Sequence, residues 1–149
     1  MNGEGVNTRQ TLDQRRANHA WDKITSLQVI SKQVIPKKEP RKYDEDAKEY
    51  AREARKLPAR IMAAGLGQAL AFIMAKEKKK HSLKRLHTDL TDWVITQRSI
   101  PAKKPDSLMG SIIEGDSDFL RRATDEALAY LVWLNRFAEA EGLTEEEKS

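Results

Sequence analysis

The sequence has no cysteine, few aromatic residues and no long apolar run. Without a thiol, the chain can form neither a disulfide nor a thiolate metal site. Its apolar stretches are shorter than the roughly 20 residues that cross a bilayer, and the opening MNGEGVNTRQ lacks the apolar core of a secretory signal. These absences predict a protein of the cytoplasm that does not contact a membrane.

Histidine, the other common metal ligand, occurs only three times. We expect His19 to be packed or half-exposed beside the apolar stripe of the first helix. His81 and His87 are six residues apart, which places them on different sides of a helix, whereas a metal site needs a closer repeat such as i, i+4 with further ligands. The sequence therefore predicts no metal site.

Motifs for catalysis or cofactor binding are also missing. The segment from Gly65 to Leu70 begins like a dinucleotide-binding loop, but no strand precedes it and residue 70 is leucine. The carboxylate pairs Asp89/Asp92 and Asp116/Asp118 suit helix caps or exposed polar faces better than acid–base chemistry. We expect no catalytic residue and no cofactor.

The charges divide the chain into two parts. Residues 1–106 hold 23 Lys and Arg against 13 Asp and Glu, a net +10, while residues 107–149 hold 4 against 10, a net −6. Such a division favours a polyanionic partner for the first part, and it allows head-to-tail contact between copies. An ordinary solvated surface remains the alternative.

Apolar residues recur at steps of three and four almost throughout, which predicts an all-α, compact bundle of about five to six helices. Helices are expected near residues 10–34, 44–57, 58–78, 83–94, 107–113 and 116–142, with prolyl linkers at 36–40 and 100–105. We expect one domain over residues 1–149, with 1–8 and 143–149 flexible.

The segment YAREARKLPARIMAAGLGQALAFIM, residues 50–74, carries three specific expectations. Proline disfavours helix in the residue before it, so a kink or break is predicted at Leu57-Pro58. Met62 is placed on the apolar stripe of the following helix. Because glycine costs roughly 1 kcal/mol in a helix, Gly65 and Gly67 suggest that another backbone approaches closely.

Basic residues form clusters at helical spacing. One stripe holds Lys48, Arg52, Arg55 and Lys56, with Arg60 just beyond it, and the second cluster holds Lys76, Lys78, Lys79, Lys80, Lys84 and Arg85. Cations at such spacing bind phosphates without reading sequence. The tryptophans lie on apolar stripes, so we expect backbone contact to dominate over base stacking.

Two motifs resemble a known family. Tyr50, the run Lys56–Ile61 and the run Gly65–Phe72 resemble the central motif of the small subunit of type III-B CRISPR effector complexes, the Cmr complexes. Residues 123–128 and 133–139 are similar to its second signature, and Arg16-Ala17 in the opening helix also agrees. The resemblance covers most of the chain.

The resemblance implies an all-α, non-catalytic subunit for antiviral defence. Several copies would stack as a minor filament beside the backbone subunits, with the large subunit as a further partner, and would contact the guide RNA/target RNA. It implies RNA contacts at Arg16, Lys56, Arg60 and Arg136, and charge adds Arg52 and the lysine cluster. Arg136 could equally anchor the bundle through an ion pair.

Two other functions remain open at this stage. One is a purely structural protein-interaction subunit that never touches RNA. The other is a small DNA-binding regulator, although Leu57-Pro58 offers no convincing helix-turn-helix. We also expect charge reversal at Lys56 and Arg60 to weaken RNA binding and leave the fold intact.

Overall fold

The computed structural model describes residues 9–29 and 41–144, and all the regular structure in these two ranges is helical. The elements are α1 (Leu12–Thr25), α2 (Glu45–Ala64), α3 (Leu66–Glu77), α4 (His81–Thr91), the π-helix η1 (Asp92–Gln97), α5 (Leu108–Glu114) and α6 (Ser117–Ala140). The all-α bundle expected from the apolar spacing is confirmed.

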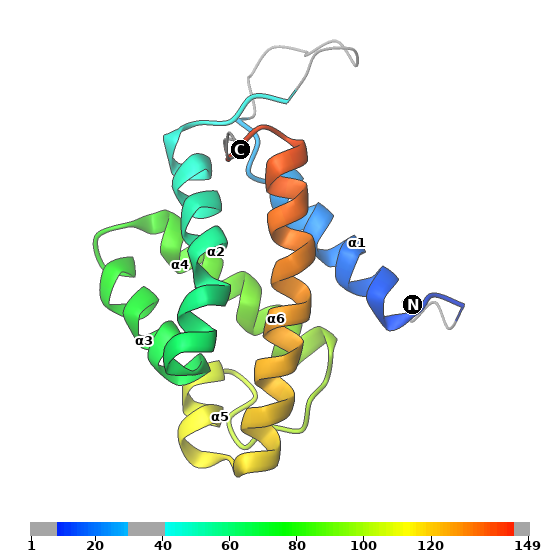
Figure 1. Cartoon of the computed structure of the whole chain (residues 1–149), viewed down its shortest axis with the longest axis vertical. Coiled ribbons are helices and arrows are strands. Elements are labelled where there is room, and N and C mark those ends of the chain that lie inside the picture. Colours follow the sequence, from blue (N-terminus) through cyan, green and yellow to red (C-terminus); the bar gives the residue numbers. More distant parts are fainter. Residues whose placement is uncertain (1–8, 30–40, 145–149) are drawn as a thin grey trace.

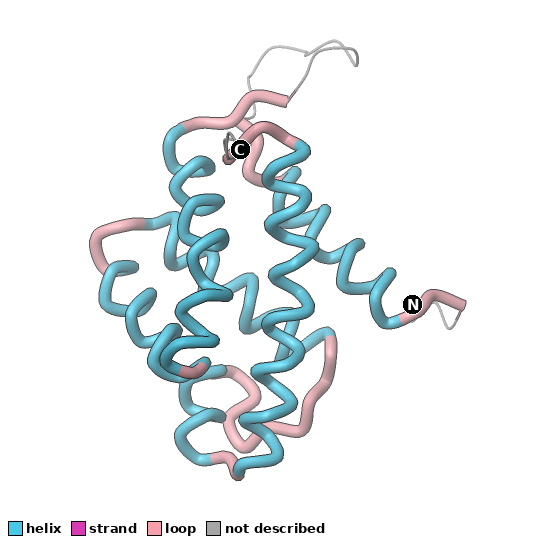
Figure 2. Tube along the Cα trace, viewed as in Figure 1, coloured by secondary structure: helices cyan, strands magenta, loops and turns pink. Residues whose placement is uncertain are grey.

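Helices α2 and α6 lie side by side at the centre of the bundle (Figure 1). Helix α1 packs on α6, whereas α3 and α4 pack on α2 and on each other. Figure 2 shows that only short loops join most of these helices. Leu57, Leu86, Tyr130 and Leu131 are almost fully buried in the single core that results.

Short polar caps start several helices where the sequence predicts them. Asp44 accepts a hydrogen bond from the Ala47 amide at 3.0 Å, and Asp116 accepts one from the Phe119 amide at 2.9 Å. Thr11 forms a reciprocal capping box with Gln14 at the start of α1. These caps satisfy backbone donors that have no partner inside the helix.

The predicted break at Leu57-Pro58 is wrong, because α2 continues through Pro58. Proline has no N–H, so it leaves the carbonyl four residues earlier, that of Ala54, without its helical donor. The side chain of Asn135 on α6 donates to this carbonyl through Nδ2 at 3.1 Å. A residue 81 positions away in sequence thus removes part of the penalty that the proline imposes.

The helix ends instead at Gly65, whose φ of 90° and ψ of 160° are accessible essentially only to glycine. A Cβ added at Gly65 would have no atom within 4 Å, and one at Gly67 would meet only Ile112 Cγ2 at 3.4 Å. The predicted close approach of another backbone is therefore wrong for the described part of the chain. Gly65 serves the turn between α2 and α3.

Two residues that the apolar spacing places on buried stripes are exposed. Met62 is 75% exposed, and Leu120, on the stripe expected for residues 116–142, is 39% exposed. Met62 was placed on a helix that began at Pro58, and the continuous α2 turns it outward. The other predicted stripes are buried, including Leu83, Leu86, Leu90, Trp93 and Val94.

The fourth predicted helix changes its winding near its end. After Thr91 the chain adopts π-helical turns, and the Arg98 amide donates to the Trp93 carbonyl five residues earlier at 2.8 Å. The wider turn keeps Trp93, Val94 and Ile95 all buried.

The chain ends differ in part from the sequence expectations. Helix α1 stops at Thr25, short of the predicted residue 34, and the predicted linker at 36–40 lies outside the described residues. Residues 1–8 and 145–149 also lie outside them. Leu143 and Thr144, assigned to a flexible tail, are only 5% and 8% exposed.

Candidate nucleic-acid interface

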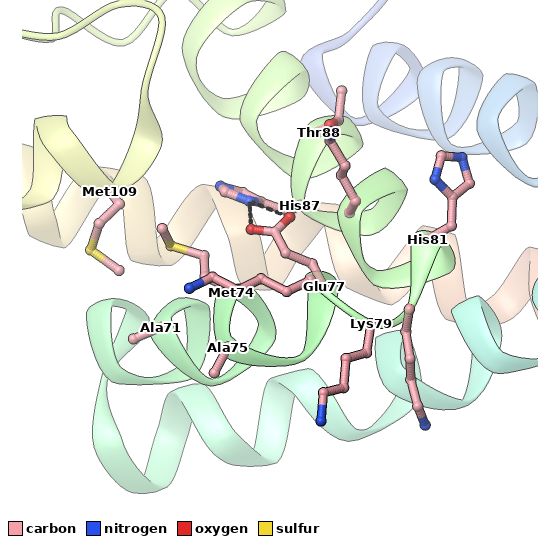
Figure 3. Close-up of a pocket in the computed structure, with 12 residues that line it drawn as sticks. Ala71, Met74, Ala75, Glu77, Lys79, His81, His87, Thr88 and Met109 are labelled. Atoms are coloured by element: carbon pink, nitrogen blue, oxygen red, sulfur yellow. Dashed lines mark hydrogen bonds and ion pairs between the residues drawn. The ribbon is translucent and has the colours of Figure 1, made fainter.

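The lysine cluster borders a hollow of about 1100 Å³ between α3 and α4, which Met109 of α5 also lines. Glu77 on α3 reaches His87 on α4, with Oε1 and Nδ1 3.2 Å apart (Figure 3). Lys79 points away from this pair toward the outside. Met74 and Ala71 add apolar surface to the hollow, so it combines an apolar lining with a basic rim.

Apart from Lys76, which pairs with Glu53, the cations of this cluster fall into two groups. Lys80 pairs with Glu49 at 3.0 Å, and Arg85 donates to the Ser26 hydroxyl at 2.6 Å. Lys78, Lys79 and Lys84 are exposed, and no ion pair is found for them within residues 9–29 and 41–144. These three lysines are thus the most accessible cations of the cluster.

Glu49 fixes the start of α4 against α2. The Ser82 hydroxyl donates to its carboxylate at 2.8 Å, and Lys80 donates at 3.0 Å. The hydrogen bonds from Ser82 and then Lys80 lower the pKa of Glu49 below its ordinary value. Lys80 therefore holds the loop after α3 in place, which leaves less of its charge for a ligand.

A separate set of cations surrounds Glu53 on α2, whose side chain is buried. Arg60 and Lys76 each lie 3.5 Å from Oε1, and Lys56 lies 3.8 Å from Oε2. We call these four residues the Glu53 cluster. An unpaired buried carboxylate is costly, so Lys56, Arg60 and Lys76 have a structural role as well as exposed charge.

This arrangement revises one sequence-based expectation. Charge reversal at Lys56 and Arg60 would place two more carboxylates beside Glu53, leaving Lys76 as its nearest cation. Such a variant would be destabilised, so a loss of RNA binding could not be assigned to a lost contact.

The basic stripe of α2 borders another hollow, of about 630 Å³. Its lining consists of Lys48, Arg52, Arg55, Lys56, Gly142, Leu143 and Thr144. Lys56 belongs both to this hollow and to the Glu53 cluster, so the basic surface continues along α2 from one to the other.

Arg16 lies in a different place from the other candidates. It donates to Glu126 on α6 from Nε at 2.5 Å and from Nη2 at 3.0 Å. The hydrogen bond to Glu126 is the main cause of a raised Arg16 pKa. Arg16 is only 18% exposed and ties α1 to α6, which limits its reach toward a ligand.

Glu126 also joins two further parts of the bundle. It also accepts hydrogen bonds from Trp93 Nε1 at 3.0 Å and from Arg98 Nε at 2.9 Å. Burial alone raises the pKa of Glu126, but the bonds from Arg16, Trp93 and Arg98 outweigh it, and the pKa is lowered. This buried carboxylate connects several elements of the bundle and is not part of an exposed site.

Arg136, the last candidate, is 72% exposed on α6 and lies 3.5 Å from Glu139 one turn later. It lines neither of the two hollows. The structure thus brings Arg52, Lys56 and Arg60 together with Lys76. The other lysines of the cluster line the α3–α4 hollow, whereas Arg85 reaches Ser26 beyond α1, and Arg16 and Arg136 lie elsewhere.

The histidines take other positions. His19 is half-buried, as expected, and lies 2.7 Å from the Tyr130 hydroxyl and 2.8 Å from Asp92 Oδ2. It thereby links α1 to α6 and η1. Across the described ranges no group of three or more His, Cys, Asp or Glu could hold a metal ion. Nor does the described chain contain a helix with the length and apolarity needed to cross a membrane.

Sequence reasoning missed Glu49 and Glu53, the two carboxylates that pair with the basic clusters. A signal for Glu53 is its place inside the otherwise apolar α2 frame of Tyr50, Ala54 and Leu57.

Comparison with known proteins gives consistent results. The family model described as CRISPR-associated protein (Cas_Cmr5) matches residues 12–141. A "CRISPR system Cmr subunit Cmr5" from Thermus thermophilus is 34% identical over 116 residues, which are 78% of this chain and 95% of that relative. The crystal structure of a CRISPR-associated Cmr5 family protein from the same organism aligns with a TM-score of 0.64 and 28% identity, covering 88% of this chain and 97% of that one. The family match over most of the chain, together with this fold similarity, shows that the chain belongs to the Cmr5 family of CRISPR-associated proteins.

Proposed function

We propose that this chain is a non-catalytic small subunit of a type III-B CRISPR (Cmr) ribonucleoprotein effector complex and contacts the RNA backbone through its basic face. Membership of the Cmr5 family supports the complex. The observation that carries the RNA contact is the exposure of Lys78, Lys79 and Lys84 at the rim of the α3–α4 hollow without an ion pair in the described ranges.

The chemistry of these lysines favours phosphate over base recognition. Ammonium groups at the rim neutralise phosphates and release counterions, which gives affinity that falls steeply with salt and depends little on sequence. Within the complex, pairing between guide and target would select the sequence, and this face would hold the backbone.

Stacking of copies belongs to the same proposal. The basic surface lies on α2, α3 and α4, whereas α5 and α6 carry exposed acids such as Glu114 and Asp118. Opposite charges on these two parts of the molecule favour head-to-tail contact in a minor filament, in which the basic face of each copy continues along the RNA.

The test is a salt titration of RNA binding by the full chain. Changing Lys78, Lys79 and Lys84 to glutamine should weaken binding to single-stranded RNA and reduce the slope of log affinity against log salt by about 2, because each phosphate contact contributes about 0.7. Fluorescence anisotropy measures both quantities, and circular dichroism checks the fold.

A matched control removes the same charge elsewhere, at Lys103, Arg121 and Arg122. An equal loss in the control would show that net charge, and not the hollow, governs binding. The alternative, a structural subunit that never meets RNA, predicts no cross-link between RNA and this chain in the assembled complex.

A further inference from the structure

One aromatic side chain lies outside the core among the cations of the basic face. Phe72 on α3 is 41% exposed, whereas the next residue, Ile73, is fully buried. Ala71 and Ala75 are also exposed on α3, but they line the α3–α4 hollow and contribute only methyl groups. Phe72 is thus the large exposed apolar side chain of α3.

Two cations lie close to the Phe72 ring. The Arg60 guanidinium carbon lies 4.1 Å from the ring centroid, and the Lys76 ammonium lies 4.5 Å from it. Both are cation–π distances. Glu53 pairs with the same two cations, so its buried carboxylate on α2 fixes the cations that lie beside the ring.

We propose that Phe72 is a stacking platform for one unpaired nucleobase of RNA, with Lys56, Lys76 and Arg60 neutralising the flanking phosphates. The inference rests on the proposed function and adds a base contact to a surface that otherwise grips phosphates. Aromatic rings beside a basic groove are how proteins bind single strands with little sequence preference. Phe72 is 41% exposed with both cations beside its ring, so part of the side chain remains open to a ligand.

The charged residues around Phe72 favour RNA over a protein partner. The buried centres of protein interfaces are depleted in charged residues, and lysine is depleted across interfaces in general. Lys56 and Lys76 are 59% and 40% exposed, so their charges are open to solvent and to phosphate. A protein covering Phe72 would have to desolvate them.

The experiment compares variants of the full chain on paired RNA probes. One probe is a single-stranded oligouridine, and the other has the same length but abasic sugars in place of the nucleosides. Phe72→Leu keeps apolar volume but removes the π face, and Phe72→Trp enlarges it. Loss of one stacked base should weaken binding of Phe72→Leu to oligouridine by about 5- to 150-fold.

The other expected results separate stacking from charge. Phe72→Leu should bind the abasic probe as the parent does, and its salt slope should stay unchanged, because no phosphate contact is lost. Phe72→Trp should bind oligouridine at least as tightly as the parent. Thermal unfolding of each variant controls for the fold.

Three outcomes would overturn the platform. If the parent binds RNA with a steep salt slope and Phe72→Leu binds each probe as tightly as the parent does, the stacking contact is refuted while the proposed function stands. If Phe72→Leu leaves RNA affinity intact but prevents assembly with Cmr subunits, the ring belongs to a protein interface. If the parent binds neither probe, the platform and the RNA contact fall together.

Discussion

The side chain of Asn135 on α6 replaces a backbone hydrogen bond that Pro58 removes from α2. The proline leaves the Ala54 carbonyl without its helical donor, and the Asn135 amide supplies one from α6 at 3.1 Å. Asn135 Nδ2 therefore takes the place of the backbone amide that would donate to this carbonyl in a helix without proline. The pair also fastens the two central helices to each other.

A double-mutant cycle tests this pairing. Asn135→Ala should destabilise the protein by about 1–3 kcal/mol, because it leaves the Ala54 carbonyl buried and unpaired. In a Pro58→Ala background the new amide can bond to that carbonyl, so the same substitution should cost less. Urea unfolding gives the four free energies. Equal costs in both backgrounds would show that Asn135 acts only through packing.

At the scale of elements, Glu126 connects α6 to α1 through Arg16, to η1 through Trp93 and to the following loop through Arg98. Its pKa is lowered in the folded chain. A lowered carboxylate pKa contributes stability above the unfolded pKa and loses it as pH falls through the folded pKa. Part of the stability at neutral pH thus comes from this junction of helices, and acid removes it.

Glu126→Gln should lower the free energy of unfolding by about 1–3 kcal/mol at neutral pH, since charge-assisted bonds are replaced by weaker ones. The difference from the parent should shrink as pH falls below the ordinary value of 4.5. Urea unfolding followed by circular dichroism from pH 7 to acid measures it. Asp125→Asn, an exposed neighbour with the same charge change, is the control, and a pH-independent difference would contradict the assignment.

At the scale of the whole molecule, the charge division of the sequence becomes a division in space. The basic clusters gather on α2, α3 and α4, and exposed acids of the C-terminal part lie on α5 and α6 (Figure 1). Complementary charges on two parts of one surface can guide association between copies.

The head-to-tail proposal predicts salt-sensitive self-association of the full chain. Asp118→Asn with Asp125→Asn should weaken it, because these acids are exposed on α6. Asp22→Asn with Asp46→Asn removes the same charge from the basic part and should not weaken it. Sedimentation velocity measures the assembly, and salt near 1 M should abolish it, since the Debye length there is about 3 Å. Association that persists in high salt would point to an apolar contact.

Much of the fold was predictable because its signals are local. Asp44 and Asp116 cap helices within three residues of themselves, and apolar spacing identified the buried faces of α4 and α6. The family resemblance carried by the motifs around Lys56–Phe72 and residues 133–139 agrees with the family match. The basic clusters could be found, but their division into paired and accessible cations could not.

The sequence by itself determined the helical class, most helix starts, the apolar faces and the charge difference between the two parts, because each depends on residues close together in the chain. Only the tertiary structure decided that Pro58 stays inside a helix, that Arg16 serves Glu126, and that Phe72 is exposed among cations. The physical reason is distance along the chain. Asn135 meets Ala54 across 81 positions and Glu126 meets Arg16 across 110, so these hydrogen bonds exist only once the helices have packed.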